Sequence, residues 1–390
     1  MSFPSWPNFD EESINSTVSI LKSGKVNYWT GIEGKKFERE FANWCGTDFA
    51  IALSNGSVAL TAAYMALGIK EGDEIITTPR TFIATASTAM LLGARILFAD
   101  VDTNSGCINV DSIKPLINKK TKAIVVVHLA GWPADMHSIC ALGKKYNISI
   151  IEDCSQAHGA KINGKNVGSF GDIATWSFCQ DKIVSTAGEG GMITTSNENL
   201  WRHVWSLKDH GKDIDSVNKN DHSLGYRWLH ETIGTNFRLT EIQSSIGRYQ
   251  LKKLTEWNRI RTENALILIE KLRNFNLIRI PLPEKNLCHA WYKFYCYLIP
   301  SCLKKGWDRD RIISEIISEG YPAYHGSCSE LYLEKCFENS IPNYAQIKSL
   351  PNAKLLGETS LMFLVHPTIS RKQMKLYADV IANIIKRATS

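Results

Sequence analysis

The sequence contains no long apolar run and no recognisable secretion signal. A membrane-spanning helix needs about 20 predominantly apolar residues, and no stretch of this chain reaches that length. The first residues, MSFPSWPNFDEES, provide neither a basic segment nor an apolar segment of the kind found in signal peptides. We therefore expect a cytoplasmic protein with no membrane partner.

The chain also lacks the cysteine spacing of metal-binding modules. None of its 10 cysteines forms a Cys-x-x-Cys pair, so a structural zinc site of the usual spacing is not expected, and we predict no metal. A disulfide framework is not expected in a chain of this length without a secretion signal. We interpret the cysteines as reduced and mostly buried thiols.

Charge of one sign is not strongly in excess either. The chain has 45 Lys+Arg against 39 Asp+Glu, a net charge of +6, and its basic residues form short clusters far apart. A nucleic-acid-binding protein would show a basic stripe or a known module, and neither is present. Hydrophobic residues make up 44% of the 390 residues, which excludes a disordered chain. A nucleotide or phosphate ligand is compatible with this charge.

Short β-rich runs alternate with helical stretches through the first part of the chain. Continuous Val/Ile-rich runs joined by helices predict an α/β fold with a mostly parallel sheet buried on both faces. In such sheets, ligands bind at the carboxyl ends of the strands. The predicted strands cover residues 48–53, 74–77, 96–100, 123–128, 148–152, 175–178 and 192–195.

The pattern changes near residue 256 to helices around a small number of strands. We predict a large domain over 1–255, whose N-terminal segment can pack on the other domain, and a smaller α+β domain over 256–390. The predicted elements around and after this boundary are helices 239–254 and 257–272, a strand at 294–299, and helices 309–318 and 372–387.

Three strand ends carry unusual residues. Ser54-Asn55-Gly56-Ser57 follows the first strand and precedes a helix, an arrangement that favours an anion, although any turn to a helix suits these residues. Asp153 directly follows an apolar strand; it either caps a helix or meets a cationic ligand. Lys182 lies between an apolar strand and a Gly-rich segment; it is either a surface residue or a Schiff-base lysine.

The three features together fit one cofactor. Pyridoxal 5′-phosphate needs an anion cradle for its phosphate, a carboxylate for its pyridinium nitrogen and a lysine for its aldehyde. Each of these groups stands at a predicted strand end, where the fold would bring them together.

The order of motifs along the chain resembles the DegT/StrS family of nucleotide-sugar aminotransferases. The resemblance covers almost the whole sequence and implies the fold of type I pyridoxal phosphate enzymes. Its motifs are SNGSVAL (54–60), TFIATA (81–86), EDCSQAHGA (152–160), SFCQDK (177–182), GEGGMITT (188–195), DHG (209–211), GTNFRLTEIQSSIG (234–247) and SLMFLVHP (360–367).

The resemblance implies roles for individual residues. Lys182 matches the lysine that binds the cofactor aldehyde and then moves protons, and Asp153 matches the carboxylate that keeps the pyridine nitrogen protonated. Gln156 matches the side chain near the ring hydroxyl. Gly56 and Ser57 match the phosphate cradle, with a serine at 57 where threonine is common in the family.

Further positions concern the ring, the partner subunit and the substrate. Ser177 matches a hydroxyl on the phosphate, and Phe82 matches an aromatic over the ring face. Asn236 matches a residue that reaches the phosphate of the other subunit, which implies a homodimer with shared active sites. His325 matches a substrate-facing histidine, and Arg238 either faces substrate phosphate or braces its loop. The segment 179–181 is variable in the family and is a candidate for tuning the substrate.

The resemblance implies transfer of an amino group from L-glutamate to a nucleotide-linked keto sugar, for surface polysaccharide or O-antigen precursors. The commonest family reaction is C4 amination of a 4-keto-6-deoxy sugar, which we expect here. The alternatives are C3 amination, a sugar dehydratase and a catalytically silent regulator. Relatives that are dehydratases carry histidine in place of Lys182. The sequence does not identify the nucleotide. Packing is the preferred interpretation of Trp29, Trp228 and Trp291 over lining a sugar pocket.

Overall fold

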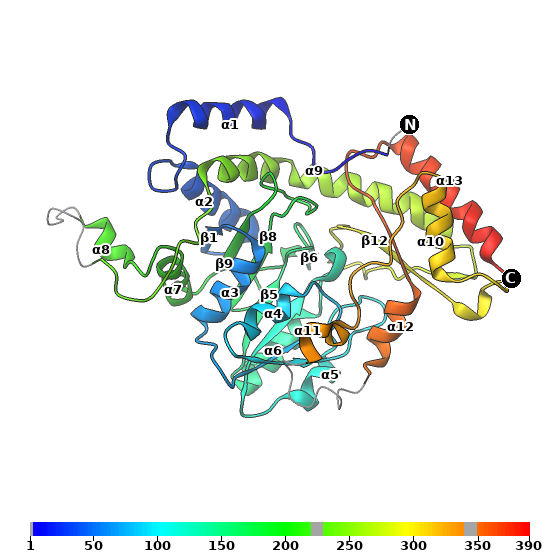
Figure 1. Ribbon diagram of the computed structural model, residues 1–390, viewed down its shortest axis with the longest axis horizontal. Helices are drawn as coiled ribbons and strands as arrows, with labels where there is room; N and C mark the ends of the chain where they lie inside the picture. The colour runs from blue at the N-terminus through cyan, green and yellow to red at the C-terminus, as the bar shows by residue number, and fades with distance from the viewer. Residues whose placement is uncertain (1–2, 220–228, 339–348) are drawn as a thin grey trace.

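The computed structural model describes residues 3–219, 229–338 and 349–390. A seven-stranded sheet forms its centre, with strand order β1-β9-β8-β5-β4-β2-β3 (Figure 1). All neighbouring strands in it are parallel except β9, which runs antiparallel to β1 and β8. The mostly parallel sheet predicted from the sequence is confirmed. Its strands are β1 (Phe49–Leu53), β2 (Glu74–Thr77), β3 (Arg95–Phe98), β4 (Thr121–Val127), β5 (Ser149–Asp153), β8 (Ile173–Ser177) and β9 (Gly191–Thr195).

Helices cover both faces of this sheet. One face packs against α2 (Glu33–Cys45) and α6 (Met136–Tyr146), through side chains such as Phe37 and Ile139. The other face packs against α3 (Gly56–Ala66), α4 (Ala84–Met90) and α7 (Glu198–Lys208), with Tyr64 and Trp205 in the core. Because both faces are buried, the strands consist of continuous apolar runs. The shorter elements of this region are α1 (Glu11–Ser23), α5 (Val110–Ile113), α8 (Ile214–Asn218), β6 (Lys161–Ile162) and β7 (Lys165–Asn166).

One long helix, α9 (Glu241–Leu272), connects the two parts of the chain (Figure 1). It begins with a capping box between Thr240 and Gln243, which satisfies backbone donors at its first turn. The sequence analysis predicted two helices that separate near residue 255, and this is wrong because α9 continues for 32 residues. No proline or glycine stands near 255 to interrupt it. The proposed domain boundary therefore lies inside a helix.

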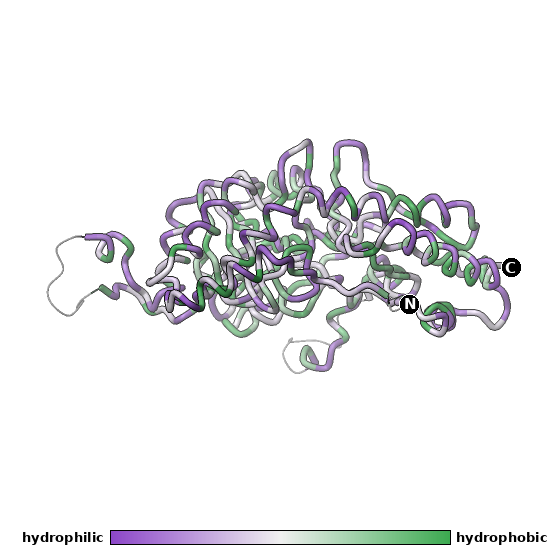
Figure 2. The backbone as a smooth tube through the Cα atoms, turned by 90° about the horizontal axis from the view of Figure 1, so that it is seen from above, coloured by the Kyte–Doolittle hydropathy of each residue, from purple (hydrophilic) through white to green (hydrophobic). Residues whose placement is uncertain are grey.

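The second half of α9 contributes to a separate core in the C-terminal part. A three-stranded antiparallel sheet, ordered β10-β12-β13, packs with α10 and α13 around Leu268, Phe294 and Ile381. Phe3 of the N-terminal segment packs against the same core, and both termini lie at this end of the molecule (Figure 1). Figure 2 shows how elongated the chain is along the axis of α9. The elements here are β10 (Ile278–Arg279), β11 (Leu287–Cys288), β12 (Phe294–Leu298), α10 (Arg309–Ser318), α11 (Lys335–Glu338), α12 (Pro351–Thr359), β13 (Ser360–Phe363) and α13 (Arg371–Ala388).

Two composition-based predictions can be compared with this structure. Within the described ranges, no helix has the length and apolar character required to cross a membrane. None of the ten cysteines, all of which lie in the described ranges, forms a disulfide, but the expectation that most are buried is wrong. Cys45, Cys107, Cys154 and Cys296 are buried, Cys140, Cys179 and Cys302 are half-buried, and Cys288, Cys328 and Cys336 are exposed.

Candidate active site

A cavity of about 1650 Å³ opens at the carboxyl ends of the central strands. Its floor contains Val127 from the end of β4, Asp153 from the end of β5 and Ser177 from the end of β8. Residues 3–6 and segments of the C-terminal part complete its wall. The cavity therefore lies where a parallel sheet is expected to bind its ligands.

The N-terminus of α3 forms one end of this cavity. Asn55 caps the helix by accepting a hydrogen bond from the backbone N–H of Val58 at 2.9 Å. Gly56 approaches β8 so closely that an added Cβ would lie 2.6 Å from the Cβ of Ser177. A helix N-terminus that faces a cavity favours an anion such as a phosphate. Gly56, Ser57 and Ser177, the residues predicted for a phosphate site, all line the cavity.

Asp153 lies at the floor of the cavity with 5% of its surface exposed. Its Oδ2 accepts a hydrogen bond from Thr85 Oγ1 at 2.9 Å, and its Oδ1 accepts one from the Ser155 N–H at 3.1 Å. Nearby, Gln156 Oε1 accepts a hydrogen bond from the Ala130 N–H at 2.8 Å. The Asp153 carboxylate is thus held in one orientation, which suits an ion pair with a protonated ring nitrogen.

Lys182 extends into the same cavity, with 15% of its side chain exposed. Its Nζ lies 3.5 Å from the Tyr292 hydroxyl and 4.0 Å from Asp181 Oδ1. Its backbone carbonyl accepts a hydrogen bond from Trp6 Nε1 at 2.8 Å. The Lys182 amine is therefore partly shielded from water. Contacts of its backbone carbonyl and of its Nζ both fix its position.

The sequence analysis did not identify several cavity residues near Lys182. Tyr292 and Lys293 immediately precede β12, and Arg261 projects from α9. Tyr292 donates a hydrogen bond to Asp181. Burial favours the neutral acid, but the Lys182 ammonium, the Tyr292 hydroxyl and Lys293 together hold the pKa of Asp181 below its usual value. A lysine directly before an apolar strand was the available signal for Lys293.

Phe82 lines the cavity and is 66% exposed, whereas three other predicted residues lie outside the cavity lining. Asn236 Oδ1 accepts a hydrogen bond from the Arg238 N–H at 3.3 Å, and Arg238 Nη1 forms an ion pair with Asp209 at 2.8 Å. His325 Nε2 lies 3.1 Å from Asp310 Oδ1 on the surface. The chain does not bring these three side chains to Lys182.

Trp29 and Trp291, two of the tryptophans considered for a sugar pocket, are not among the residues that line this cavity. Trp29 packs edge-to-face against Trp205. Trp291 is 7% exposed and stacks on His289. Trp228 lies outside the described residues. Trp29 and Trp291 therefore have a packing role.

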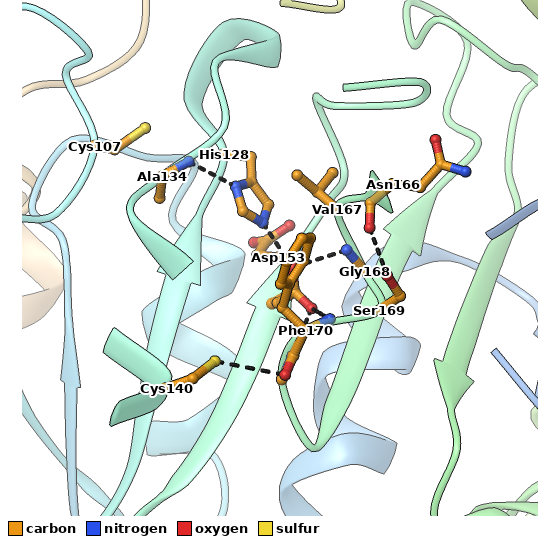
Figure 3. A network of polar contacts seen from close by, with 12 residues as sticks. Cys107, His128, Ala134, Cys140, Asp153, Asn166, Val167, Gly168, Ser169 and Phe170 are labelled. Atoms are coloured by element: carbon orange, nitrogen blue, oxygen red, sulfur yellow. Dashed lines mark hydrogen bonds and ion pairs between the residues drawn. The ribbon is translucent and has the colours of Figure 1, made fainter. Parts of the chain in front are cut away.

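A second polar cluster lies at the end of β5, directly behind the cavity. His128, Glu152 and Cys154 offer atoms within 4.8 Å of one another, as a metal site would. Glu152, however, accepts hydrogen bonds from the backbone N–H groups of Gly168, Phe170 and Gly171 and lies 3.0 Å from His128 Nε2. Figure 3 shows His128 linked to Ala134, and Gly168 and Phe170 facing the same site.

The hydrogen bonds of this cluster define its protonation. His128 Nδ1 accepts a hydrogen bond from the Ala134 N–H at 3.0 Å, so the ring proton is on Nε2 and points to Glu152. Burial favours neutral Glu152, but the His128 ring and the backbone donors lower the pKa of this carboxyl. The atoms of His128 and Glu152 that could bind a metal are therefore already engaged, and these two residues brace the loop 168–171 against β5.

The cavity residues fit pyridoxal 5′-phosphate. The accessible end of α3 at Gly56 suits a phosphate, the oriented carboxylate of Asp153 suits the ring nitrogen, and the amine of Lys182 suits the aldehyde. All three groups face one cavity.

Comparisons with known proteins agree with this chemistry. An aminotransferase from Psychrobacter cryohalolentis is 48% identical, with a TM-score of 0.96 over 99% of both chains. The GDP-perosamine synthase of Escherichia coli O157:H7 is 36% identical over 290 residues, 74% of this chain and 75% of that protein. The dTDP-3-amino-3,6-dideoxy-alpha-D-galactopyranose transaminase of Aneurinibacillus thermoaerophilus is 32% identical over 375 residues, 96% of this chain and 95% of that protein.

A family model matches almost the whole chain, from residue 7 to residue 382. The match includes every cavity group described above except the first residues of the N-terminal segment. The chain therefore belongs to the DegT/DnrJ/EryC1/StrS aminotransferase family, whose enzymes use pyridoxal 5′-phosphate.

Proposed function

We propose that this protein transfers the amino group of L-glutamate to C4 of a nucleoside-diphosphate-linked 4-keto-6-deoxy sugar, for surface polysaccharide precursors such as those of O-antigen. The observation that carries the proposal is the convergence of Lys182, Asp153 and the Gly56 cradle on one cavity. The nucleotide-sugar substrate is supported by the relatives, which include a GDP-perosamine synthase. A cytoplasmic location is part of the same proposal.

Each of the cavity residues would have a separate role in such a reaction. When bound, the cofactor supplies a ring that withdraws electrons from the carbon that loses its proton. Asp153 keeps the ring nitrogen protonated, because Thr85 and Ser155 hold its carboxylate in place. Lys182 would hold the cofactor through its amine, and its Nζ would accept and return a proton at the donor carbon. Gln156 is proposed to lie near the ring hydroxyl and Phe82 over the ring face.

A homodimer with shared sites is part of the proposal. Phe82 is 66% exposed in the single chain although it lines the cavity, which is consistent with cover from a second copy. Asn236 lies outside the cavity of its own chain, as expected if it serves the phosphate site of the other copy. Arg238 and His325 are proposed substrate contacts, although the ion pair of Arg238 with Asp209 favours the bracing role.

The experiment is a single-turnover absorbance measurement on the purified holoenzyme. L-glutamate should convert the cofactor to its amine form, and one nucleotide keto sugar should restore the original spectrum. A panel of 4-keto and 3-keto sugars linked to uridine, thymidine and guanosine diphosphates would identify the substrate. The proposal fails if no amino acid converts the cofactor while Lys182 still holds it.

A second candidate reaction is amination at C3. The transaminase from Aneurinibacillus thermoaerophilus, named for a 3-amino sugar, covers 96% of this chain at 32% identity. The two reactions give different products, so NMR of the amino sugar distinguishes them by the carbon that bears nitrogen. Restoration of the spectrum by 3-keto sugars alone would replace the C4 proposal with the C3 one.

A further inference from the structure

The cavity has an excess of cationic groups beside Lys182. Lys182, Lys293 and Arg261 all line it, and Asp181 is the carboxylate in contact with this group. Asp181 lies 4.0 Å from the Lys182 amine and 3.7 Å from the Lys293 amine. One carboxylate thus faces two lysines, and a buried arginine stands next to them. An anionic ligand would balance these charges.

Arg261 is the clearest sign of a missing ligand. Its side chain is 1% exposed, and its Nη1 makes only long hydrogen bonds, of 3.4 Å and 3.3 Å, to the carbonyls of Trp291 and Tyr292. Its Nε and Nη2 have no hydrogen-bond partner among the described residues. No carboxylate of the described ranges lies within ion-pair distance of it. Leaving a buried cation unpaired is costly.

Lys293 lies on the same side of the cavity, with 16% of its side chain exposed. Burial lowers its pKa to about 8, although Asp181 acts in the opposite direction. Arg261 and Lys182 each disfavour the charge of Lys293 as well, which shows that the three cations are close enough to repel one another. A carboxylate placed among them would relieve that repulsion.

We propose that Arg261 and Lys293 form a carboxylate-binding subsite that holds the amino donor next to Lys182. A guanidinium with free Nε and Nη2 presents the paired donors that a carboxylate accepts side by side. The ring of Trp6 covers Arg261, with 5.0 Å between the guanidinium carbon and the ring centre. The Trp6 ring thus closes one face of the guanidinium. This inference rests on the proposed function.

The test measures binding separately from catalysis. Glutarate, a dicarboxylate without an amine, is titrated calorimetrically into the holoenzyme and into the Lys293→Met, Lys293→Arg and Lys252→Met variants. Lys252 is an exposed lysine of α9 and serves as the control. Because Lys293→Met removes one charge-assisted contact, the affinity of this variant for glutarate should be roughly 10-fold lower or more. Lys293→Arg should retain most of the affinity, and Lys252→Met all of it.

Two further measurements identify the anion and the role of Arg261. UDP and GDP should bind to Lys293→Met as they bind to the wild type. Arg261→Lys should weaken glutarate and raise the glutamate concentration needed for half-maximal single-turnover rate, while the reaction with the keto sugar keeps its rate. If Arg261→Lys does not fold, the result for Lys293→Met decides alone.

The inference is overturned if Lys293→Met binds glutarate like the wild type. It is also overturned if the variant loses UDP or GDP affinity instead, because the subsite would then hold the sugar nucleotide. A wild-type protein that binds glutarate through Lys293 but is not converted by glutamate would leave the subsite standing and refute the proposed function.

Discussion

Thr85 Oγ1 donates a hydrogen bond to Oδ2 of Asp153 at 2.9 Å, from a helix on the opposite side of the cavity floor. Thr81 Oγ1 lies 2.9 Å from the same hydroxyl, so the hydroxyl is oriented in turn. The hydrogen bond therefore holds the Asp153 carboxylate in one orientation relative to a ring nitrogen. Thr85 lies in the TFIATA motif, but its role became visible only in the structure.

We expect Thr85→Val to slow the half-reaction with glutamate by about 5- to 10-fold, since one hydrogen bond contributes about 1 kcal/mol. The rate of the single-turnover absorbance change would be measured. Thr88→Val is the matched control, because Thr88 lies on the same helix and donates to the Ala84 carbonyl. Equal losses in both variants would contradict a specific role for Thr85.

Replacing Lys182 with alanine removes the amine that binds the aldehyde. We expect transamination to fall by about 1000-fold or more and the protein to remain folded, because the side chain is at the cavity and not in the core. Borohydride reduction followed by peptide mass spectrometry should find the cofactor attached at Lys182 in the wild type and at no lysine in the variant. Lys252→Ala, with an exposed lysine, should behave like the wild type.

Gly56→Ala should weaken cofactor binding by about 10-fold or more, because a Cβ at that position would lie 2.6 Å from the Cβ of Ser177 and disturb the helix end. The dissociation constant of the phosphate-bearing cofactor would be measured by fluorescence. Ser57→Ala adds no bulk and should have the smaller effect of one lost hydroxyl. A larger loss in Ser57→Ala than in Gly56→Ala would argue against the steric account.

Glu152→Gln should lower the free energy of unfolding by about 2–4 kcal/mol. Both carboxylate oxygens of Glu152 accept hydrogen bonds from backbone N–H groups, and the glutamine amide would replace one of these acceptors with an NH₂ donor. Urea denaturation at pH 7 measures this, with exposed Glu284→Gln as the control. The folded-state pKa of Glu152 is lowered, so its contribution is present above the unfolded pKa of about 4.3 and is lost as the pH falls below it. On acidification, the free energy of unfolding should therefore fall less in the Gln variant than in the wild type. The same fall in both proteins would show that Glu152 does not cause the acid dependence.

Glutarate affinity should fall as the pH rises through about 8, the lowered pKa of Lys293, because the anion requires the charged amine. The titratable and charged groups near Lys293 are Asp181, Lys182, Arg261, Tyr292 and His366. Lys293→Arg leaves those groups in place and keeps its charge at high pH. The fall near pH 8 should therefore disappear in this variant. A fall of the same size in both proteins would assign the titration to another group.

The sequence predicted the class of fold, which the structure confirms, and the main groups of the proposed site. Apolar runs alternating with helices predicted the parallel sheet, because strands buried on both faces must be apolar throughout. Gly56, Asp153 and Lys182 follow or end different strands, and all three line one cavity. Asp153 and Lys182 were detectable because a carboxylate or a lysine is unusual near the end of a buried strand, whereas Gly56 was suggestive only together with them.

Other features depended on contacts between segments distant in the chain. Arg261 lies on α9 and Lys293 directly precedes β12, and only packing brings these two residues to Asp181 and Lys182. The same holds for Trp6, whose indole reaches the Lys182 carbonyl across 176 positions of sequence. Whether a lysine or arginine is buried depends on its neighbours in space, so composition and spacing along the chain cannot reveal it.

The helix α9 also depends partly on local sequence and partly on tertiary contacts. Local signals at its first turn, Thr240 and Gln243, were sufficient to start a helix near 240. Its passage through residue 255 depends on the two cores that it joins, one under α1 and α2 and the other around Leu268. The sequence by itself indicated the strands of the central sheet and which side chains could carry chemistry. Only the tertiary structure decided which charges share a cavity, because burial and electrostatic pairing act between residues that are neighbours in space and not in sequence.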